Sequence, residues 1–288
     1  METTTQPQMN PLAMFMRQPK IHIRLPSNGN FWPEGSLILN ETGEYPVYSM
    51  TAHDELMIKV PDALMNGQAI VDVIQHCVPS IKNAWHTPNI DIDVILIAIR
   101  LATYGEKMTT PISVGEIEME YTVDLRTIMD TLNNQIVWDP IVPINEDLTV
   151  FVKPINYKQL SQAAIQSFET QKIIQMSNNE TISDEDKVKI FKDSFSKLTN
   201  VTIGMVGASI YKIDSINGST DNPKFIKEFI DNADKEIFNK IQTHIENLKE
   251  LHSVKPVVVT VTDEMRANGI VGDTIEIPLM FDASTFFA

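Results

Sequence analysis

Hydrophobic and polar residues alternate in two segments of the first half of the chain, which predicts two half-buried β-strands. Residues 20–25 read Lys-Ile-His-Ile-Arg-Leu, and Pro26 ends the run. Residues 116–123 alternate acidic with apolar side chains and give the strongest strand signal in the sequence. A period of two places every second side chain on one face of a sheet. The turn formers Asn28-Gly29 then allow the first strand to continue into a small antiparallel sheet.

Further strands are predicted where β-branched residues cluster between turn residues. Two short runs near the first strand and one in the middle of the chain fit this description: 37–39, 44–48 and 148–152. Near the end of the chain, 256–262 and 274–281 flank Gly-containing turns. We expect these last two runs to pair as an antiparallel hairpin.

Helical spacing of apolar residues predicts helices along most of the remaining chain. The predicted segments are 52–58, 68–77, 91–104, 124–132, 157–176, 183–198 and 232–251. Thr51, followed by Asp54 and Glu55, has the pattern of a helix N-terminus. The helix over 183–198 is expected to carry Val188, Phe191, Phe195 and Leu198 on one stripe. Residues 201–215 fit either a strand or a buried helix.

The predicted fold class is α+β, with small antiparallel β elements, an N-terminal mixed region, a helical middle and a C-terminal β hairpin. The chain of 288 residues is long enough for one large domain or two modest ones. We divide it into a flexible tail (1–19), an N-terminal α+β domain (20–155), a helical subdomain (156–254) and a C-terminal hairpin with an apolar end (255–288).

The charge of the chain is strongly negative, with 23 Lys and Arg against 38 Asp and Glu and a formal net charge of −15. Such a chain repels the phosphate backbone unless a basic stripe overrides the repulsion, so we expect no nucleic-acid partner. No leader sequence and no apolar segment of about twenty residues is seen, so we expect no membrane partner and a protein kept in the cytoplasm.

Candidate chemistry is sparse and each candidate has a structural explanation. His53-Asp54-Glu55 could bind a metal or relay protons, but a solvated first helical turn is favoured. Asp91 and Asp93 have a spacing that some magnesium enzymes use, although capping of a helix N-terminus is the simpler interpretation. We therefore predict no catalytic residues, no metal and no cofactor.

Three weaker patterns are also explained without a ligand. Cys77 is the single cysteine and lies among apolar residues, so a buried inert thiol is favoured over a zinc site with His76 and His86. The acidic row Glu116, Glu118 and Glu120 is typical of a solvated strand face. Gly204 and Gly207 do not follow a phosphate-loop pattern.

Aromatic residues at turns point to recognition by other proteins. Phe31 and Trp32 lie between Asn28-Gly29 and Pro33-Glu34-Gly35, which predicts an anchor that faces a partner or packs a loop. Alternatively, both rings only cover the small sheet. Tyr48 is the third predicted partner-binding residue. Phe286 and Phe287 are predicted to dock on the protein or on a neighbouring subunit, because they would otherwise leave apolar surface in water.

The order of these motifs resembles the baseplate hub and tail-assembly proteins of contractile-tailed, T4-type bacteriophages. The resemblance covers mainly residues 21–125, and a second, weaker resemblance lies at residues 275–288. The segments that carry it are Leu25–Gly35, Pro46–Leu56, Pro61–Gly67, Cys77–Ile81 and Ile99–Gly105. Relatives can carry a cysteine pair like a small zinc ribbon at the positions matching 112–121. This chain has no cysteine there, which argues against a zinc requirement.

The resemblance implies a structural protein of the phage baseplate hub that acts in tail assembly through contacts with other baseplate or tail proteins. It implies residence in the virion, after assembly in the host cytoplasm. Two alternatives remain open: a transient assembly chaperone that is absent from the mature virion, and a metal-dependent hydrolase that uses Asp91 and Asp93. The sequence leaves the oligomeric state open.

Overall fold

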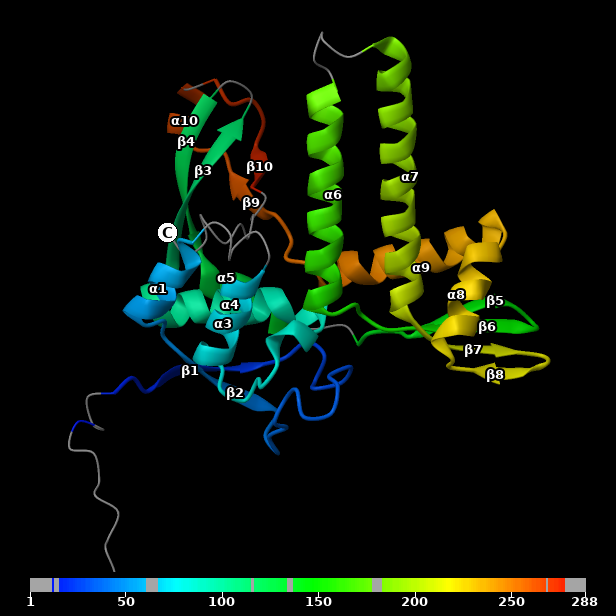
Figure 1. Cartoon of the computed structure of the whole chain (residues 1–288). Helices are drawn as coiled ribbons and strands as arrows, with labels where there is room; N and C mark the ends of the chain where they lie inside the picture. The colour runs from blue at the N-terminus through cyan, green and yellow to red at the C-terminus, as the bar shows by residue number, and fades with distance from the viewer. Residues whose placement is uncertain are drawn as a thin grey trace, which may run out of the picture.

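The computed structural model describes most of the chain in one assembly of helices and small sheets (Figure 1). The described residues are 12, 16–60, 67–114, 117–133, 137–177, 183–267 and 269–277. Side chains are described for these residues except 111–114, 117–119, 133, 177, 184 and 264. The α+β class and the helical middle predicted from the sequence are confirmed.

The N-terminal region combines a two-stranded sheet with helices that cover it. Its elements are β1 (Pro19–Arg24), β2 (Glu44–Tyr48), α1 (Ala52–Ile58), α3 (Gln68–Cys77), η2 (Ala84–His86) and α4 (Asn89–Tyr104). The strands pair antiparallel, with Ile23 opposite Tyr45. The expectation that 37–39 extends this sheet is wrong. Leu37 makes only an isolated bridge to Ile81, and the Ile38 amide donates to the carbonyl of Ser80.

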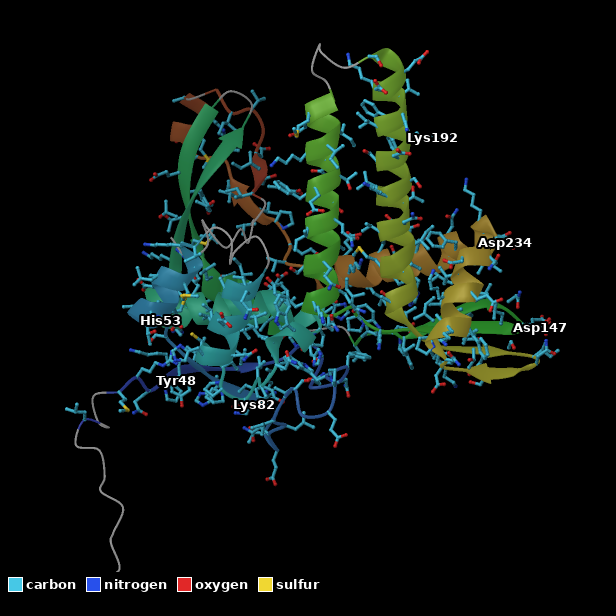
Figure 2. The ribbon with its side chains drawn as sticks, in the orientation of Figure 1. Tyr48, His53, Lys82, Asp147, Lys192 and Asp234 are labelled. Carbon is cyan, nitrogen blue, oxygen red and sulfur yellow. The ribbon has the colours of Figure 1, made fainter. Side chains whose placement is uncertain are left out.

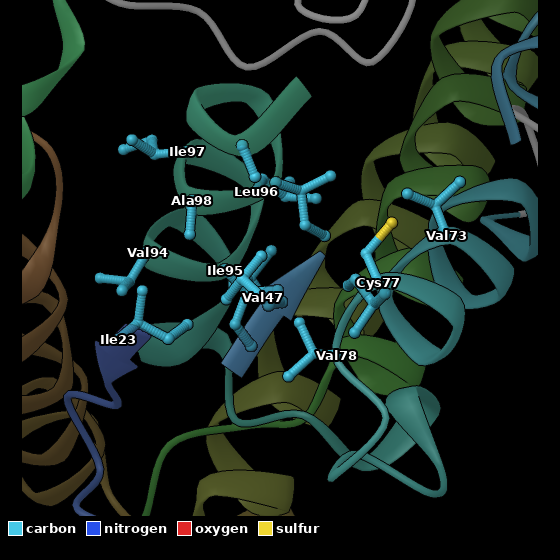
Figure 3. Close-up of a cluster of buried hydrophobic side chains, with 14 of the residues drawn as sticks. Ile23, Val47, Val73, Cys77, Val78, Val94, Ile95, Leu96, Ile97 and Ala98 are labelled. Carbon is cyan, nitrogen blue, oxygen red and sulfur yellow. The ribbon is translucent and has the colours of Figure 1, made fainter. Parts of the chain in front are cut away.

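The first hydrophobic core forms around α4. This helix is buried along most of its length because apolar residues occupy nearly all sides of it. Val47 of β2, Cys77 of α3 and Ile95 of α4 are completely or almost completely buried in one cluster (Figure 3). The helix ends at Gly105, whose φ of 89° lies in the region that favours glycine.

Two hairpins lie beside this core and are in contact with it. The first consists of β3 (Lys107–Val114) and β4 (Ile117–Asp124) and leads into α5 (Leu125–Asn133). The second consists of β9 (Val257–Thr260), α10 (Asp263–Ala267) and β10 (Thr274–Ile277). The predicted C-terminal pairing is confirmed for these residues, with Thr274 opposite Thr260. Tyr121 of β4 and Val257 of β9 pack in a small cluster with buried Ile277.

A second hydrophobic core lies under a four-stranded antiparallel sheet. The strands are β5 (Ile141–Asn145), β6 (Leu148–Val152), β7 (Ile210–Ser215) and β8 (Gly218–Thr220), and the helices that pack on them are α8 (Pro223–Asn232) and α9 (Lys235–His252). The ambiguous segment 201–215 contains both structures, because a helix continues to Ser209 and β7 follows. This core joins strands before residue 155 to helices after it. The domain boundaries proposed above stay a prediction.

Two long helices, α6 (Tyr157–Ser177) and α7 (Asp184–Ser209), stand side by side and project from the body, while α9 crosses near their base (Figure 1). The apolar stripe predicted on α7 is largely exposed. Val188 is 69% exposed and Phe195 is 64% exposed. The physical reason is that α6 contacts a neighbouring side of α7, where short side chains such as Ser194 are buried. Within the described residues, no helix combines the length and apolar character needed to cross a membrane.

Candidate partner-binding surface

The loop after β1 is folded by its turn residues into a compact shape. The amide of Asn28 donates to the carbonyl of Leu25, and the amide of Asn30 donates to that of Ser27. Asn28 and Phe31 have positive φ angles of 52° and 67°. Such angles are uncommon outside glycine and indicate that contacts elsewhere hold the loop in place.

Asp91 supplies the central contact that holds this loop. The side chain of Asp91 is completely buried. One carboxylate oxygen accepts from the Ser27 amide at 2.7 Å, and the other accepts from the Ser27 hydroxyl at 2.5 Å and from Trp32 Nε1 at 2.9 Å. The interpretation of Asp91 as a cap of its own helix is therefore wrong. The cap residue of α4 is Pro88, and Asp91 instead ties the helix to a loop 64 residues away in sequence.

Phe31 connects the same loop to the second core. Its ring meets the ring of Trp138 edge-on, with 6.3 Å between centroids. Trp138 is buried, and its Nε1 donates to the carbonyl of Val152 at 3.0 Å. Phe31 and Trp32 are each only partly exposed and pack inward. Their contacts fix the loop against both cores, and binding of a partner by these rings stays a prediction.

Two exposed residues on the same loop were missed by sequence reasoning. Ile38 is 55% exposed and Leu39 is 68% exposed. A Cβ atom added to Gly29 would come within 2.7 Å of the Leu39 side chain, so glycine allows Leu39 to lie across the loop. The available signal was the run Leu37-Ile38-Leu39 itself. A half-buried strand can bury only alternate members of three consecutive apolar residues.

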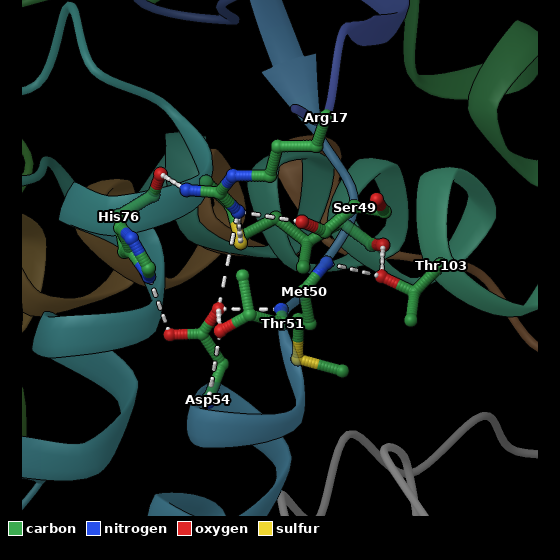
Figure 4. Close-up of polar contacts among 9 residues, drawn as sticks. Arg17, Ser49, Met50, Thr51, Asp54, His76 and Thr103 are labelled. Carbon is green, nitrogen blue, oxygen red and sulfur yellow. Dashed lines mark hydrogen bonds and ion pairs between the residues drawn. The ribbon is translucent and has the colours of Figure 1, made fainter. Parts of the chain in front are cut away.

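A second polar network lies at the start of α1 (Figure 4). The Thr51 hydroxyl accepts from the Asp54 amide, and the Asp54 carboxylate accepts from the Thr51 amide at 2.7 Å, which forms a capping box. His76 Nδ1 lies 2.6 Å from the other oxygen of Asp54. The predicted helix start is confirmed. The favoured picture of a solvated first turn is wrong for Asp54, which is buried.

Hydrogen bonds stabilise the charged form of Asp54. Burial pushes its pKa upward, but donors from Thr51 and His76 outweigh burial and hold that pKa below its ordinary value. His53 and Glu55 do not join this carboxylate, because adjacent residues on a helix point in different directions. The three residues therefore form no common metal or proton-relay site.

Arg17 connects the N-terminal segment to this network. Its guanidinium donates to the carbonyls of Ser49 and His76, both at 2.6 Å, and lies 3.9 Å from the Asp54 carboxylate. It also lies over the ring of Tyr48, 5.5 Å from the centroid. Tyr48 is partly exposed at the end of β2 (Figure 2). The position of Tyr48 is thus fixed by Arg17, which belongs to the segment predicted to be a tail.

Cys77 is a buried thiol, as predicted. Burial raises the pKa of this thiol to about 12, so it is protonated and unreactive at neutral pH. His86 Nδ1 pairs with the Ser36 hydroxyl at 2.7 Å, away from the contact of His76 with Asp54. Among the described residues, no three His, Cys, Asp or Glu side chains gather in a group that could hold a metal ion.

Asp93 faces a small cavity of about 220 Å³ between α4, α6 and α9. The cavity is also lined by Leu160, Lys249 and His252. Burial raises the pKa of Asp93 to about 6. Asp93 and Asp91 therefore lie in different surroundings, and Asp91 already accepts hydrogen bonds on both oxygens. No observation on these two residues favours the metal-dependent hydrolase.

Asp93→Asn should stabilise the protein at pH 7 by about 2 kcal/mol, because asparagine resembles the protonated acid and carries no buried charge. A carboxyl whose pKa is raised on folding binds its proton more tightly in the folded state. Stability is therefore lost as the pH rises from about 4 to about 6. The gain from the variant should shrink toward pH 4. Urea unfolding at pH 7 and pH 4 measures the gain in free energy of unfolding. Equal gains at both pH values would contradict the raised pKa of Asp93.

Some of the remaining predicted positions lie outside the described residues. Phe286 and Phe287 lie outside the described residues, as does Glu116. The side chain of Glu118 also lies outside them, whereas that of Glu120 is exposed. Gly204 and Gly207 lie within α7 and line a cleft of about 740 Å³ between α7, α8 and β7.

Comparison with protein families agrees with the resemblance seen in the motifs. The family model described as "T4 bacteriophage base plate protein" matches residues 16–265, which span both hydrophobic cores. The chain belongs to this family. No curated protein and no solved structure matches it. Membership identifies the chain as a phage baseplate structural protein and associates it with the virion and with other tail or baseplate proteins.

Proposed function

We propose that this baseplate protein is a structural component of the baseplate hub and acts in tail assembly through protein–protein contacts, without catalysis. The family match over residues 16–265 carries this proposal. The buried titratable groups described above support it, because Asp54 and Asp91 are engaged in holding loops and helices together. They resemble the fixed interior of an interaction module more than a reactive site.

The proposed contact region consists of the loop surface, defined by Phe31, Trp32, Ile38 and Leu39, and of Tyr48 at the end of β2. Exposed apolar side chains on a loop that is fixed by buried contacts bind a partner with little loss of conformational freedom. Phe286 and Phe287 are proposed as a further contact. Nucleic acid is not a proposed partner, because the net charge of −15 opposes binding to phosphates.

Mass spectrometry of purified tails and of baseplate intermediates tests the hub proposal. A hub component should be present in intermediates and in finished tails at a constant ratio to the other baseplate proteins. A transient chaperone should be present in intermediates and absent from finished tails. Absence from both would contradict a role at the hub. Before incorporation, we expect the protein in the host cytoplasm.

The double variant Ile38→Ser, Leu39→Ser should reduce tail assembly at least about tenfold while leaving the melting temperature of the isolated protein nearly unchanged. Both side chains are already largely in water, so the folded state loses little apolar burial. Complementation of a phage that lacks the gene, followed by counting of complete tails, measures the effect.

Ile216→Ser is the matched control for this variant. Ile216 is 76% exposed but lies at the distant turn between β7 and β8. This control should support normal assembly. Normal assembly by the double variant would remove Ile38 and Leu39 from the proposed contact surface.

A further inference from the structure

Short side chains are buried on both α6 and α7, which are in contact with each other. Ala163, Thr170 and Ser194 are buried, with exposed fractions of 8%, 3% and 3%. The Thr170 hydroxyl is satisfied within its own helix, because it donates to the carbonyl of Gln166 at 2.7 Å. The larger Ile174, Ile190 and Leu198 are half-buried, so only some of the apolar side chains of the two helices remain exposed.

Several large apolar side chains of this pair are exposed. Phe168 is 52% exposed, and three residues of α7 that recur at spacings of three and four are also exposed: Val188 (69%), Phe191 (38%) and Phe195 (64%). Helical spacing places these three on one stripe of α7. We call the four residues the hairpin face.

Phe168 adds an exposed ring on the other helix of the pair. Each residue of an α-helix turns the side-chain direction by about 100°. Phe168 precedes Thr170 by two residues and therefore lies about 160° around α6 from it, on the outer side of that helix. Phe195 follows Ser194 by one residue and lies about 100° around α7 from it. The α7 stripe is thus the centre of the apolar surface, and Phe168 lies at its edge.

The dimensions of the pair suit a protein interface. A helix of 21 residues such as α6 is about 30 Å long, and two packed helices are about 20 Å wide, which gives a face of roughly 600 Å². A stable interface of ordinary size covers about 800 Å² on each partner. Contact between two such faces, with the flanking side chains included, approaches that area.

Charge distinguishes this pair of helices from the rest of the chain. Together α6 and α7 contain six lysines and five acidic residues, whereas the whole chain has a net charge of −15. Two copies of the protein repel each other over most of their surface. Where the α6–α7 pair of one copy faces the α6–α7 pair of the other, the net repulsion is small. Figure 2 shows Lys192 on the projecting part of α7.

We propose that the hairpin face binds the same face of a second copy of this chain, which joins two helical pairs into an antiparallel four-helix bundle. A two-fold axis between the two copies places the aromatic residues of one hairpin face against those of the other. Such a contact requires no opposite charge on the partner. The nearly neutral charge of the helical pair favours a second copy over a strongly charged partner. This inference does not rest on the hub proposal.

Sedimentation equilibrium of the full chain tests the proposal over a range of concentrations. The wild-type protein should dimerise at micromolar concentration. Phe195→Glu should weaken dimerisation at least about 100-fold, because it buries an unpaired charge in the interface. The circular dichroism and melting temperature of the diluted, monomeric protein should stay unchanged, since Phe195 is 64% exposed within one copy.

Ile216→Glu is the control, because Ile216 is exposed on the distant β7–β8 turn, and this variant should dimerise like the wild type. A monomeric wild type at about 100 μM would overturn the proposal. It would also be overturned by a Phe195→Glu variant that dimerises normally. If the wild type is monomeric but the Phe195→Glu variant fails in tail assembly, the hairpin face binds a different protein and not a second copy of this chain. Failure in either way leaves the mass-spectrometric test of the hub proposal unaffected.

Discussion

Replacing Asp91 with alanine should lower the free energy of unfolding at pH 7 by about 3 kcal/mol. The variant removes the acceptor for the buried Ser27 amide and hydroxyl and for the partly buried Trp32 Nε1, which keeps only a longer contact of 3.3 Å to the Ser27 hydroxyl. Each buried donor without an acceptor costs about 1–3 kcal/mol, so the donors of Ser27 and Trp32 together outweigh what the variant gains by removing a buried charge. The loop surface should lose its fixed position at the same time.

The effect of Asp91→Ala should depend on pH in a defined direction. Burial raises the pKa of Asp91 to about 6, so the wild-type protein gains stability as the pH falls from 7 to 5, whereas the variant lacks this gain. The cost of the variant should therefore be about 1 kcal/mol larger at pH 5. Urea unfolding at both pH values measures it.

Asp72→Ala is the control for Asp91→Ala, because Asp72 is an exposed acid on α3. This control should change the free energy of unfolding by less than about 0.5 kcal/mol. A cost of less than about 1 kcal/mol for Asp91→Ala at pH 7 would show that the buried carboxylate does not hold the loop.

Trp138→Ala should destabilise the protein by about 3–5 kcal/mol. The ring is buried in the second core, where it contacts Phe31 edge-on and lies 5.5 Å from the ring of His252. Its removal leaves a cavity where the loop, β6 and α9 meet. Guanidinium unfolding followed by circular dichroism measures the loss.

Trp138→Phe separates ring packing from hydrogen bonding. Phenylalanine keeps an aromatic ring but cannot donate to the carbonyl of Val152. Its cost should be only about 1–2 kcal/mol. If both variants cost the same, the hydrogen bond to Val152 dominates, and packing of the Trp138 ring does not stabilise the junction.

Local sequence patterns determined the elements whose signals lie within a few residues. The helices α1 and α3 have the predicted ends, because capping at Thr51 and the break at Pro79 act on neighbouring backbone groups. The strand β6 also has the predicted bounds. In contrast, β3 was missed, because its Thr and Pro residues become a strand only by pairing with β4.

The candidate surface shows the same division between local and distant causes. The sequence identified the aromatic turn at Phe31 and Trp32, and its motif order indicated the family that residues 16–265 match. It could not show that Trp32 donates to Asp91, because the hydrogen bond joins residues 59 apart in sequence. Such a contact depends on how the first core places α4 beside the loop.

Exposure was the property that the sequence predicted least well. A 3.6-residue period indicates that a helix has an apolar side, but it does not say which neighbouring element covers that side. In α7 the tertiary structure places Ser194 toward α6 and leaves Phe195 in water. The sequence by itself determined the family, the fold class and most helices and strands. Only the tertiary structure decided which apolar residues form the cores and which remain available to a partner, because burial depends on contacts between segments distant in sequence.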